Sequence, residues 1–555
     1  MTDFETHPDR YVHWKLAVEG PVARLVLAVQ EERPHIQASL DGTLPAQPPT
    51  YRLKLNSYDL GVDIELCDAV QRLRFEHPEV KAVIVGSALP TVFCAGANIM
   101  MLASSTHPFK VNFCKYTNET RCSIEDAAKH SGQRWICAAA GTASGGGYEL
   151  ALACDDIVLI DDGNSAVSLP EVPLLGVLPG TGGLTRLVDK RKIRRDLADM
   201  FSTLAEGCKA KKALEWKLID AAFPRTKFEA GVNERAARVA AQPSKKDGSV
   251  GIKLLPLAPQ VTSEKIEYRH VTVEIDAPHR LATLTVRGPE TAAPASVAEV
   301  HALGSDCWTL RAMRELDDAL CKLRFDCSEI GLVLLKTRGD LARTLAWSDF
   351  MAAHREDWLV NEIVLQSART LRRLDGMAKS LFAILDPGSC FAGELLEAAL
   401  ACDRTYMLND EGRPVSVAVG ALSDRALLMT NGLSRLESRF LADPARAGKL
   451  AKERGTLDAE AALEAGLVTV APDELDWEDD LRLAIEERVS LSPDALTGME
   501  ASLRYGGPET TDSKIYGRLS AWQNWIFTRP NATGETGALK LFGQPDRPKF
   551  DWRRT

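Results

Sequence analysis

The sequence has 555 residues, of which 45% are hydrophobic and 26% charged, as expected for a folded protein of more than one domain. Its formal net charge of −10 disfavours nucleic acid and anionic membranes as partners, and no apolar stretch is long enough to span a bilayer. The acidic, polar N-terminus lacks the basic and apolar regions of a signal peptide. The 12 cysteines are scattered without metal-ligand spacing, so we expect a reduced, cytoplasmic protein without a metal site.

Alternating β and α segments fill the first half of the chain. Short apolar runs predict strands at residues 24–29, 81–87, 135–141 and 156–161, and the apolar spacing of residues 63–74 predicts a helix. Apolar strands separated by helices indicate an α/β architecture with a buried, largely parallel sheet. A stretch that contains Pro34, Pro45, Pro48 and Pro49 is typical of a surface insertion.

The pattern of the first half recurs about 250 residues later. Residues 330–340 repeat the run at 81–87, and residues 380–386 repeat the run at 135–141. The segment ELALACD, which begins at Glu149, matches EAALACD, which begins at Glu397. This internal duplication predicts a first domain at residues 1–242, a linker rich in proline and lysine at 243–265, a second, similar domain at 266–490 and a helical C-terminal region at 491–555.

Two glycine-bearing turns follow apolar strands in the first domain. One lies in FCAGANIMML, residues 93–102, and the other in GTASGGGYELALACD, residues 141–155. Glycines let backbone N–H groups approach a ligand because no Cβ stands in the way, and the second turn runs into a predicted helix whose first amides suit an anion. Two such turns can aim two N–H groups at one carbonyl oxygen and stabilise an enolate formed there.

These turns, followed by SLPEVPLLGVLPGTGGLTRL at residues 168–187, resemble the motifs of the crotonase (enoyl-CoA hydratase) superfamily in order and spacing. The resemblance implies a spiral of ββα units, duplicated in tandem here, that binds an acyl-CoA thioester, with coenzyme A present only as part of the substrate. It implies oxyanion donors at Ala97 and Gly146 and catalytic carboxylates at Glu149 and Glu171. The further substrate contacts that it implies come from Ala95, Gly96, Asn98, Ile99 and Gly145.

Paired carboxylates suit this chemistry because they can hold a water between them, one acting as base and the other as acid. Each has an alternative, since a first-turn glutamate such as Glu149 also stabilises a helix start and Glu171 can be an incidental charge in an apolar run. By the resemblance, Cys114 lies in a region that lines the acyl pocket, where it exchanges a proton or is a buried, inert thiol. The basic run at residues 189–195 can meet CoA phosphates or form a solvated face.

The second domain keeps little of this site. The residues that stand opposite the site of the first domain are Trp347, Ser348, Gly393, Glu394, Leu395, Glu397 and Val419. Only Glu397 preserves a carboxylate, opposite Glu149, whereas Val419 stands opposite Glu171 and both glycine turns are altered. We therefore expect the second domain to have lost catalysis and to serve packing, dimerisation or pocket closure.

A chain of this length with a second, degenerate crotonase domain is similar to superfamily members that cleave an epoxidised aromatic ring. That resemblance implies conversion of 2,3-epoxybenzoyl-CoA and two waters into 3,4-didehydroadipyl-CoA semialdehyde and formate, in benzoate degradation and without an added cofactor. Two alternatives stay open: an enoyl-CoA hydratase or isomerase that acts on another acyl-CoA, and a non-catalytic acyl-CoA-binding protein. The fused pair of domains predicts a homodimer, with no nucleic acid or membrane as partner.

Overall fold

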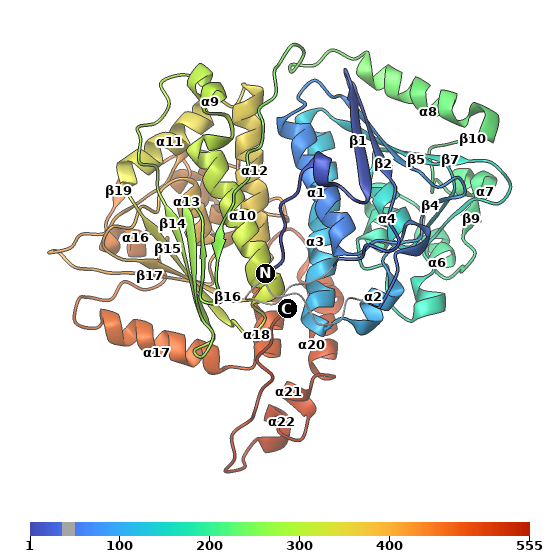
Figure 1. Ribbon diagram of the computed structural model, residues 1–555. Helices are drawn as coiled ribbons and strands as arrows, with labels where there is room; N and C mark the ends of the chain where they lie inside the picture. The colour runs from blue at the N-terminus through green and yellow to red at the C-terminus, as the bar shows by residue number, and fades with distance from the viewer. Residues whose placement is uncertain (36–49) are drawn as a thin grey trace. The chain divides into compact units, whose positions relative to one another are not determined.

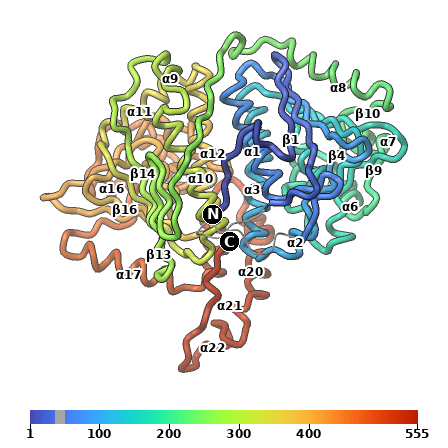
Figure 2. Tube along the Cα trace, viewed as in Figure 1, coloured from blue at the N-terminus to red at the C-terminus, as the bar shows by residue number. Residues whose placement is uncertain are grey.

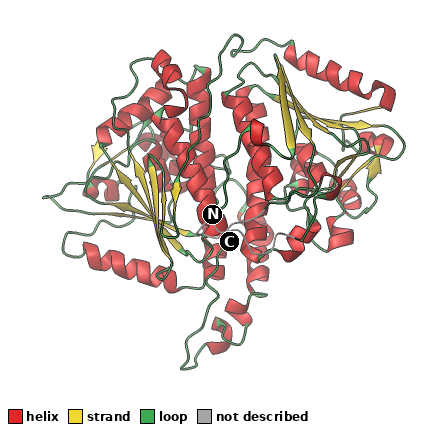
Figure 3. Cartoon of the chain, in the orientation of Figure 1, coloured by secondary structure: helices red, strands yellow, loops and turns green. Residues whose placement is uncertain are grey.

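The computed structural model describes residues 1–35 and 50–555, so the predicted insertion around Pro45, Pro48 and Pro49 lies outside the described residues. The chain divides into two compact units, each with its own sheet and helices (Figures 1 and 3). The N-terminal unit comprises the described residues between 3 and 254, and the C-terminal unit comprises residues 255–555 together with residues 1 and 2. The division falls inside the stretch interpreted as a linker.

The main sheet of the N-terminal unit has six strands, in the order β1-β2-β3-β5-β7-β10. These strands are β1 (Trp14–Glu19), β2 (Val22–Leu27), β3 (Ala82–Ser87), β5 (Arg134–Ala139), β7 (Asp156–Ile160) and β10 (Ala221–Phe223). β1 and β2 form an antiparallel hairpin, and every further neighbour pairs in parallel. The four strands predicted from apolar runs are therefore present and adjacent in one sheet.

A second, smaller sheet in this unit has the order β4-β6-β8-β9 and carries the glycine turns. Its strands are β4 (Val92–Cys94), β6 (Thr142–Ser144), β8 (Ala166–Ser168) and β9 (Cys208–Lys209). The helices of the unit are α1 (Leu60–Phe75), α2 (Ile99–Ser104), α3 (His107–Asp126), α4 (Gly146–Ala153), α5 (Gly183–Thr185), α6 (Arg195–Ser202), α7 (Ala210–Glu215) and α8 (Arg225–Ala240). Short 3-10 turns occupy Pro8–Arg10 and Lys54–Asn56, and π-helical segments occupy Ala127–Ser131, Glu171–Leu175 and Arg186–Lys190.

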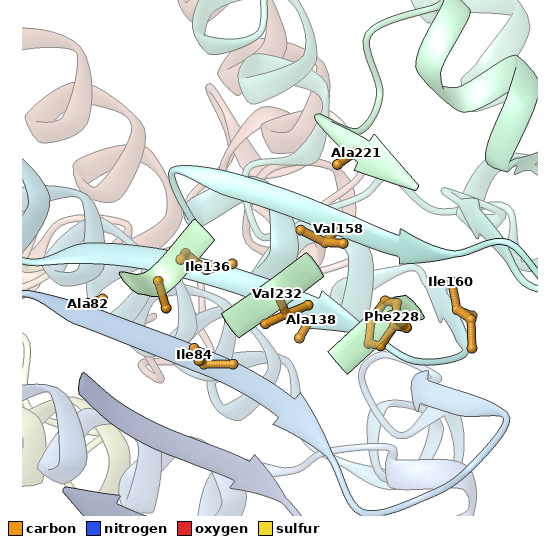
Figure 4. Packing of buried hydrophobic residues seen from close by; sticks show 10 residues of the cluster. Ala82, Ile84, Ile136, Ala138, Val158, Ile160, Ala221, Phe228 and Val232 are labelled. Atoms are coloured by element: carbon orange, nitrogen blue, oxygen red, sulfur yellow. The ribbon is translucent and has the colours of Figure 1, made fainter. Parts of the chain in front are cut away.

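Helix α8 covers one face of the main sheet through a cluster of apolar side chains (Figure 4). Phe228 and Val232 on α8 pack with Ile84 on β3, Ile136 on β5 and Val158 on β7. Burial of this set stabilises the parallel strands whose carboxyl ends lead into the glycine turns.

The sheet of the C-terminal unit has seven strands in sequential order, from β11 to β17. They are β11 (Gln260–Val261), β12 (Lys265–Glu267), β13 (Val271–Asp276), β14 (Leu281–Arg287), β15 (Leu332–Arg338), β16 (Ser380–Leu385) and β17 (Arg404–Met407), while β18 (Val417–Ala418) pairs separately with β19 (Thr456–Leu457). β11 and β12 form an antiparallel pair within or at the end of the predicted linker. Sequence patterning missed this edge pair because it is short and polar.

After β14, helices alternate with the strands of the C-terminal unit along the chain, and only helices follow β19 (Figure 2). They are α9 (Val297–Leu303), α10 (Trp308–Asp326), α11 (Leu341–Ala353), α12 (Trp358–Asp375), α13 (Glu394–Leu400), α14 (Arg435–Arg439), α15 (Pro444–Leu450), α16 (Ala459–Glu464), α17 (Trp477–Ser490), α18 (Pro493–Arg504), α19 (Thr511–Lys514), α20 (Ser520–Ile526), α21 (Pro530–Thr533) and α22 (Ala538–Leu541), with 3-10 turns at Gly304–Asp306 and Ala421–Ser423 and a π-helical segment at Ile515–Leu519. The C-terminal region predicted to be helical includes α20, which carries Trp522 and Trp525. Among the helices of residues 1–35 and 50–555, none combines the length and apolarity needed to cross a membrane.

The two sheets share one strand order. In each, an antiparallel hairpin is followed by three parallel strands, β1-β2-β3-β5-β7 in the N-terminal unit and β13-β14-β15-β16-β17 in the C-terminal unit. Helices α4 and α13 also start alike, since each follows a glycine of positive φ, Gly145 at 54° and Gly393 at 53°.

The end of the chain is tied into the C-terminal unit by Arg554. Its guanidinium donates to Glu500 Oε2 at 2.7 Å, to the Gly331 carbonyl oxygen at 2.9 Å and to Ser380 Oγ at 3.1 Å. These contacts join the chain terminus to α18 and to the start of β16.

Candidate active site

The second glycine turn leads directly into helix α4. β6 ends at Ser144, Gly145 takes the positive φ that favours glycine, and α4 begins at Gly146. A Cβ on Gly146 would lie 2.0 Å from Tyr58 Oη, and a Cβ on Gly147 would lie 2.3 Å from the carbonyl oxygen of Cys94. Close packing on both sides of the first turn of α4 therefore requires glycine at these positions.

The first glycine turn packs against the second, backbone to backbone. Gly96 has a φ of 90°, and a Cβ there would lie 2.9 Å from the Gly146 nitrogen and 3.0 Å from the Ser144 carbonyl oxygen. The structure thus brings the segment around Ala97 to the start of α4, as the resemblance implies.

Hydrogen bonds within the fold already engage most N–H groups of the two turns. The Ala95 N–H donates to the Leu55 carbonyl oxygen, and the Gly96 N–H donates to Cys94 Sγ. The Asn98 N–H donates to the Tyr58 carbonyl oxygen, and the Gly145 N–H donates to the Ser168 carbonyl oxygen. The N–H groups of Ala97 and Gly146 have no acceptor within residues 1–35 and 50–555. Both N–H groups are therefore free to donate to a ligand, as the two donors of an oxyanion hole must be.

Glu149 is buried on α4 and is held by the loop that precedes α5. Its Oε1 accepts from the backbone N–H groups of Thr181 at 2.9 Å and Gly183 at 2.8 Å, and its Oε2 accepts from the Thr181 hydroxyl. Arg186 steadies the loop, because Nη1 donates to the Thr181 carbonyl oxygen at 2.9 Å while Nε pairs with Glu125 at 2.9 Å. The carboxylate of Glu149 is thus fixed in a single orientation.

Glu171 begins the π-helical segment after β8 and is only 8% exposed. Its Oε2 has no hydrogen-bond partner in the described part of the chain, and its Oε1 lies 2.8 Å from the position that a Cβ on Gly145 would take. Burial raises the pKa of Glu171 to about 7, and the neighbouring charge of Glu149 adds to the rise. A carboxyl group beside the oxyanion turn can therefore bind or release a proton near neutral pH.

Cys114 lies on α3 near the same loop. Its Sγ is 3.8 Å from the position that a Cβ on Gly180 would take. Burial raises the pKa of the Cys114 thiol to about 11, and the charge of Glu149 raises it further. At neutral pH the side chain is a thiol, which can donate a hydrogen bond but does not act as a thiolate nucleophile.

The other predicted contacts differ in what they leave for a ligand. Asn98 caps α2, because its Oδ1 accepts from the Met101 N–H at 2.9 Å and its Nδ2 donates to the Arg52 carbonyl oxygen at 2.8 Å. The side chain of Ile99, which follows it, is 54% exposed. Thus the Asn98 side chain holds the turn in place, while Ile99 presents an apolar surface.

The basic run at residues 189–195 is largely paired within the fold. Lys190 Nζ contacts Glu125 at 2.9 Å, Arg191 contacts Asp220 at 3.1 Å, and Arg194 pairs with its near neighbour Asp196. These contacts favour the interpretation of the run as a solvated, ion-paired surface rather than a phosphate site.

The C-terminal unit lacks the first oxyanion turn. After β15 the chain enters α11 almost at once, and Ser348, predicted to stand opposite Ala97, lies inside this helix. A Cβ on Gly393 would lie 2.2 Å from Ser348 Oγ, so the hydroxyl fills the space beside the remaining turn. Glu394 replaces Gly146 at the start of α13, and burial raises the pKa of its carboxyl group to about 7.

The residue opposite Glu171 is Ala421 rather than Val419. In the N-terminal unit, Ser144 on β6 pairs with Ser168 on β8. The corresponding bridge in the C-terminal unit joins Ala392 to Ala418, whose separation in sequence is two residues longer. The number of residues between equivalent positions of the two units therefore changes in the loop that precedes Ala418. The conclusion that no carboxylate stands opposite Glu171 is unchanged.

Sequence reasoning missed three residues that the structure brings to the site. Thr181 and Gly183 hold Glu149, and the family-like segment PGTGG that contains them gave a signal that was not assigned to this role. Tyr58 reaches the start of α4 from the segment before α1. No pattern in the sequence distinguishes this tyrosine.

Comparison with known proteins matches this site to one family. The enoyl-CoA hydratase/isomerase family profile matches residues 51–252, which include every residue of the candidate site. Benzoyl-CoA-dihydrodiol lyase from Aromatoleum evansii is 50% identical over 555 residues, which cover 100% of this chain and 98% of that protein. The chain belongs to the enoyl-CoA hydratase/isomerase family, the crotonases.

Two further relatives of this crotonase match only part of the chain. The fatty acid oxidation complex subunit alpha of Aliivibrio fischeri is 31% identical over 180 residues, or 31% of this chain and 24% of that protein. A solved enoyl-CoA hydratase from Geobacillus kaustophilus HTA426 is 33% identical, covers 42% of this chain and 75% of its own, and has a TM-score of 0.34. The family assignment rests on the match along the whole chain.

Proposed function

We propose that this crotonase is a ring-cleaving carbon–carbon lyase that converts 2,3-epoxybenzoyl-CoA and two waters to 3,4-didehydroadipyl-CoA semialdehyde and formate in benzoate degradation. The 50% identity to benzoyl-CoA-dihydrodiol lyase, along essentially the whole of both chains, carries the proposal. Coenzyme A takes part only as the thioester of the substrate. The reaction as proposed is hydrolytic and redox-neutral, so it needs no metal, flavin or nicotinamide.

Binding of the thioester begins at the two glycine turns. The carbonyl oxygen accepts from the N–H groups of Ala97 and Gly146, which have no acceptor in the described chain. Both donors belong to backbones that touch each other, so they are aligned before the substrate arrives. This contact places the ring carbons next to the thioester beside the two glutamates.

Ring opening uses Glu149 and Glu171 as a pair. Glu149, oriented by Thr181 and Gly183, accepts a proton from the first water, and Glu171, with its pKa near 7, protonates the oxygen that leaves the opening epoxide. The water oxygen bonds to one epoxide carbon as the C–O bond there breaks, which gives a ring diol. Loss of a proton from the hydroxyl farther from the thioester then turns its carbon into an aldehyde and breaks the carbon–carbon bond under the former epoxide. The bonding electrons move through the two ring double bonds, the carbon next to that aldehyde takes up a proton, and the enol left beside the thioester-bearing carbon becomes the other aldehyde. The open chain carries one aldehyde beside the thioester-bearing carbon and a second aldehyde at its far end.

Formate is released in a second hydrolytic stage. The second water hydrates the aldehyde beside the thioester-bearing carbon, and removal of a proton from the hydrate breaks the adjacent carbon–carbon bond. The hydrate carbon leaves as formate, and the bonding electrons move into the thioester as an enolate, whose oxygen is stabilised by Ala97 and Gly146. Protonation of the enolate carbon completes the product.

A second candidate function is hydration of an enoyl-CoA, because a glutamate pair beside an oxyanion hole suits that reaction equally well. Formate release from 2,3-epoxybenzoyl-CoA by the purified protein tests the lyase, with crotonyl-CoA hydration measured in parallel. Crotonyl-CoA turnover without formate would favour the hydratase. Tight binding of an acyl-CoA without any turnover would favour a non-catalytic binding protein.

We also infer that the protein works as a cytoplasmic homodimer. The fused pair of similar units supports the dimer, and the 12 cysteines, all of them free thiols in the described chain, support a reducing compartment. Light scattering of the purified protein tests the oligomeric state.

A further inference from the structure

The side chain of Tyr58 is buried at the candidate site with its hydroxyl unpaired. The residue is 3% exposed, and Tyr58 Oη finds no hydrogen-bond partner in residues 1–35 and 50–555. A phenol hydroxyl that is removed from water without a partner is unfavourable, and nearly all such groups in folded proteins are satisfied. An unpaired hydroxyl beside a catalytic turn therefore points to a partner that arrives with the substrate.

Tyr58 contacts both oxyanion turns. Its backbone holds the first turn, since the Tyr58 N–H donates to the Gly96 carbonyl oxygen at 3.0 Å and its carbonyl oxygen accepts from the Asn98 N–H at 2.8 Å. This pairing sets Tyr58 beside Ala97. Its hydroxyl reaches the second turn, where it lies 2.0 Å from the position that a Cβ on Gly146 would take. The hydroxyl thus lies beside Gly146, one of the two residues proposed to donate an N–H group to the thioester oxygen.

Neighbouring side chains fix the ring, and burial keeps the hydroxyl protonated. The guanidinium of Arg121 lies 5.2 Å from the centre of the Tyr58 ring and donates through Nη2 to the Gly146 carbonyl oxygen at 3.2 Å. The ring of Phe113 lies 5.9 Å away on α3. Burial raises the pKa of Tyr58 well above its ordinary value, so the phenol acts as a hydrogen-bond donor throughout the neutral range.

We propose that Tyr58 is a further catalytic residue whose hydroxyl donates a third hydrogen bond to the thioester oxygen, alongside the N–H groups of Ala97 and Gly146. A carbonyl oxygen offers two lone pairs, whereas an enolate oxygen accepts three hydrogen bonds. The third donor therefore strengthens as charge moves onto the oxygen, and it stabilises the enolate more than the bound substrate. The inference rests on the proposed function for the identity of that enolate.

The first test compares Tyr58→Phe with Tyr148→Phe. Tyr148 is an equally buried tyrosine on α4, but its hydroxyl donates to the Leu218 carbonyl oxygen at 2.6 Å. We expect Tyr58→Phe to lower kcat for formate release on the order of a hundredfold, with little change in KM and no loss of melting temperature. Tyr148→Phe lowers the melting temperature, because it leaves a buried carbonyl oxygen unpaired, and retains kcat.

The second test needs no turnover. We expect the carbonyl stretching frequency of bound benzoyl-CoA to be lower in the wild-type protein than in Tyr58→Phe. In Tyr148→Phe we expect the same frequency as in the wild type. If this difference is present while the wild type releases no formate, the role of Tyr58 stands and the proposed reaction fails. Equal frequencies and equal kcat in wild type and Tyr58→Phe would overturn the inference, as would a melting temperature that falls in Tyr58→Phe as much as in the control.

Discussion

Replacing Glu149 by glutamine separates its chemical role from its structural one. A glutamine carbonyl oxygen can take the place of Oε1 and keep the two bonds from the Thr181 and Gly183 N–H groups. The new amide can donate to the Thr181 hydroxyl, which turns to accept. Because all three contacts persist, we expect Glu149→Gln to change the free energy of unfolding by less than about 1 kcal/mol.

The loss of proton transfer should instead be large. Removing a general acid or base costs about 10² to 10⁴ in rate, which corresponds to roughly 3 to 5 kcal/mol in the activation barrier. We expect kcat for formate release to fall by that factor in Glu149→Gln, with the dissociation constant of benzoyl-CoA nearly unchanged.

Glu149→Ala serves as the matched variant. It leaves the backbone N–H groups of Thr181 and Gly183 without their acceptor, so it should also lower the free energy of unfolding by at least about 2 kcal/mol. Steady-state formate assays and denaturant titrations measure both effects. A Glu149→Gln variant that keeps more than about a tenth of wild-type kcat would refute the acid–base role. One that unfolds as easily as Glu149→Ala would refute the account of its hydrogen bonds.

Burial raises the pKa of Glu171 from 4.5 to about 7, and the group must carry a proton to protonate the epoxide oxygen. We therefore expect kcat/KM to decline as pH rises through about 7. A profile that is flat from pH 6 to 8 would contradict this role. The folded pKa exceeds the unfolded one, so the contribution of Glu171 to stability is complete below pH 4.5 and is lost as pH rises through about 7, which a series of melting curves can follow. Gly147→Ala places a Cβ 2.3 Å from the Cys94 carbonyl oxygen, so we expect lower stability and activity, and unchanged melting would show that the turn can move. Truncation before Arg554 removes the ion pair at 2.7 Å from Glu500, which keeps Arg488 at 3.2 Å and Arg504 at 3.8 Å. We expect the free energy of unfolding to fall by about 2 kcal/mol, measured by denaturant titration against a chain that lacks only its last residue.

Local patterns predicted the parts of the fold that depend on local chemistry. The apolar run at 81–87 forms β3 because a strand buried on both faces needs little else. The triple glycine forms the N-cap and first residues of α4 because a Cβ there would meet neighbouring atoms. The resemblance predicts Ala97 and Gly146 as oxyanion donors, and the described fold leaves both of their N–H groups without acceptors.

Features that depend on distant contacts were not predictable in the same way. The raised pKa of Glu171 follows from burial beside Gly145, and the orientation of Glu149 follows from Thr181 and Gly183, more than 30 residues away. The hydroxyl of Tyr58 meets Gly146 only once both turns are folded. The repeat predicted that the first glycine turn is altered in the second domain, but not that α11 takes its place, since sequence offset alone does not reveal a change from loop to helix.

Formate release from 2,3-epoxybenzoyl-CoA by the purified protein, without any added cofactor, tests the central claim most directly. The account predicts one formate for each ring opened, at a rate that Glu149→Gln lowers by orders of magnitude. Turnover of crotonyl-CoA with no formate from the epoxide would contradict the ring-cleaving lyase and leave a hydratase built on the same two glutamates.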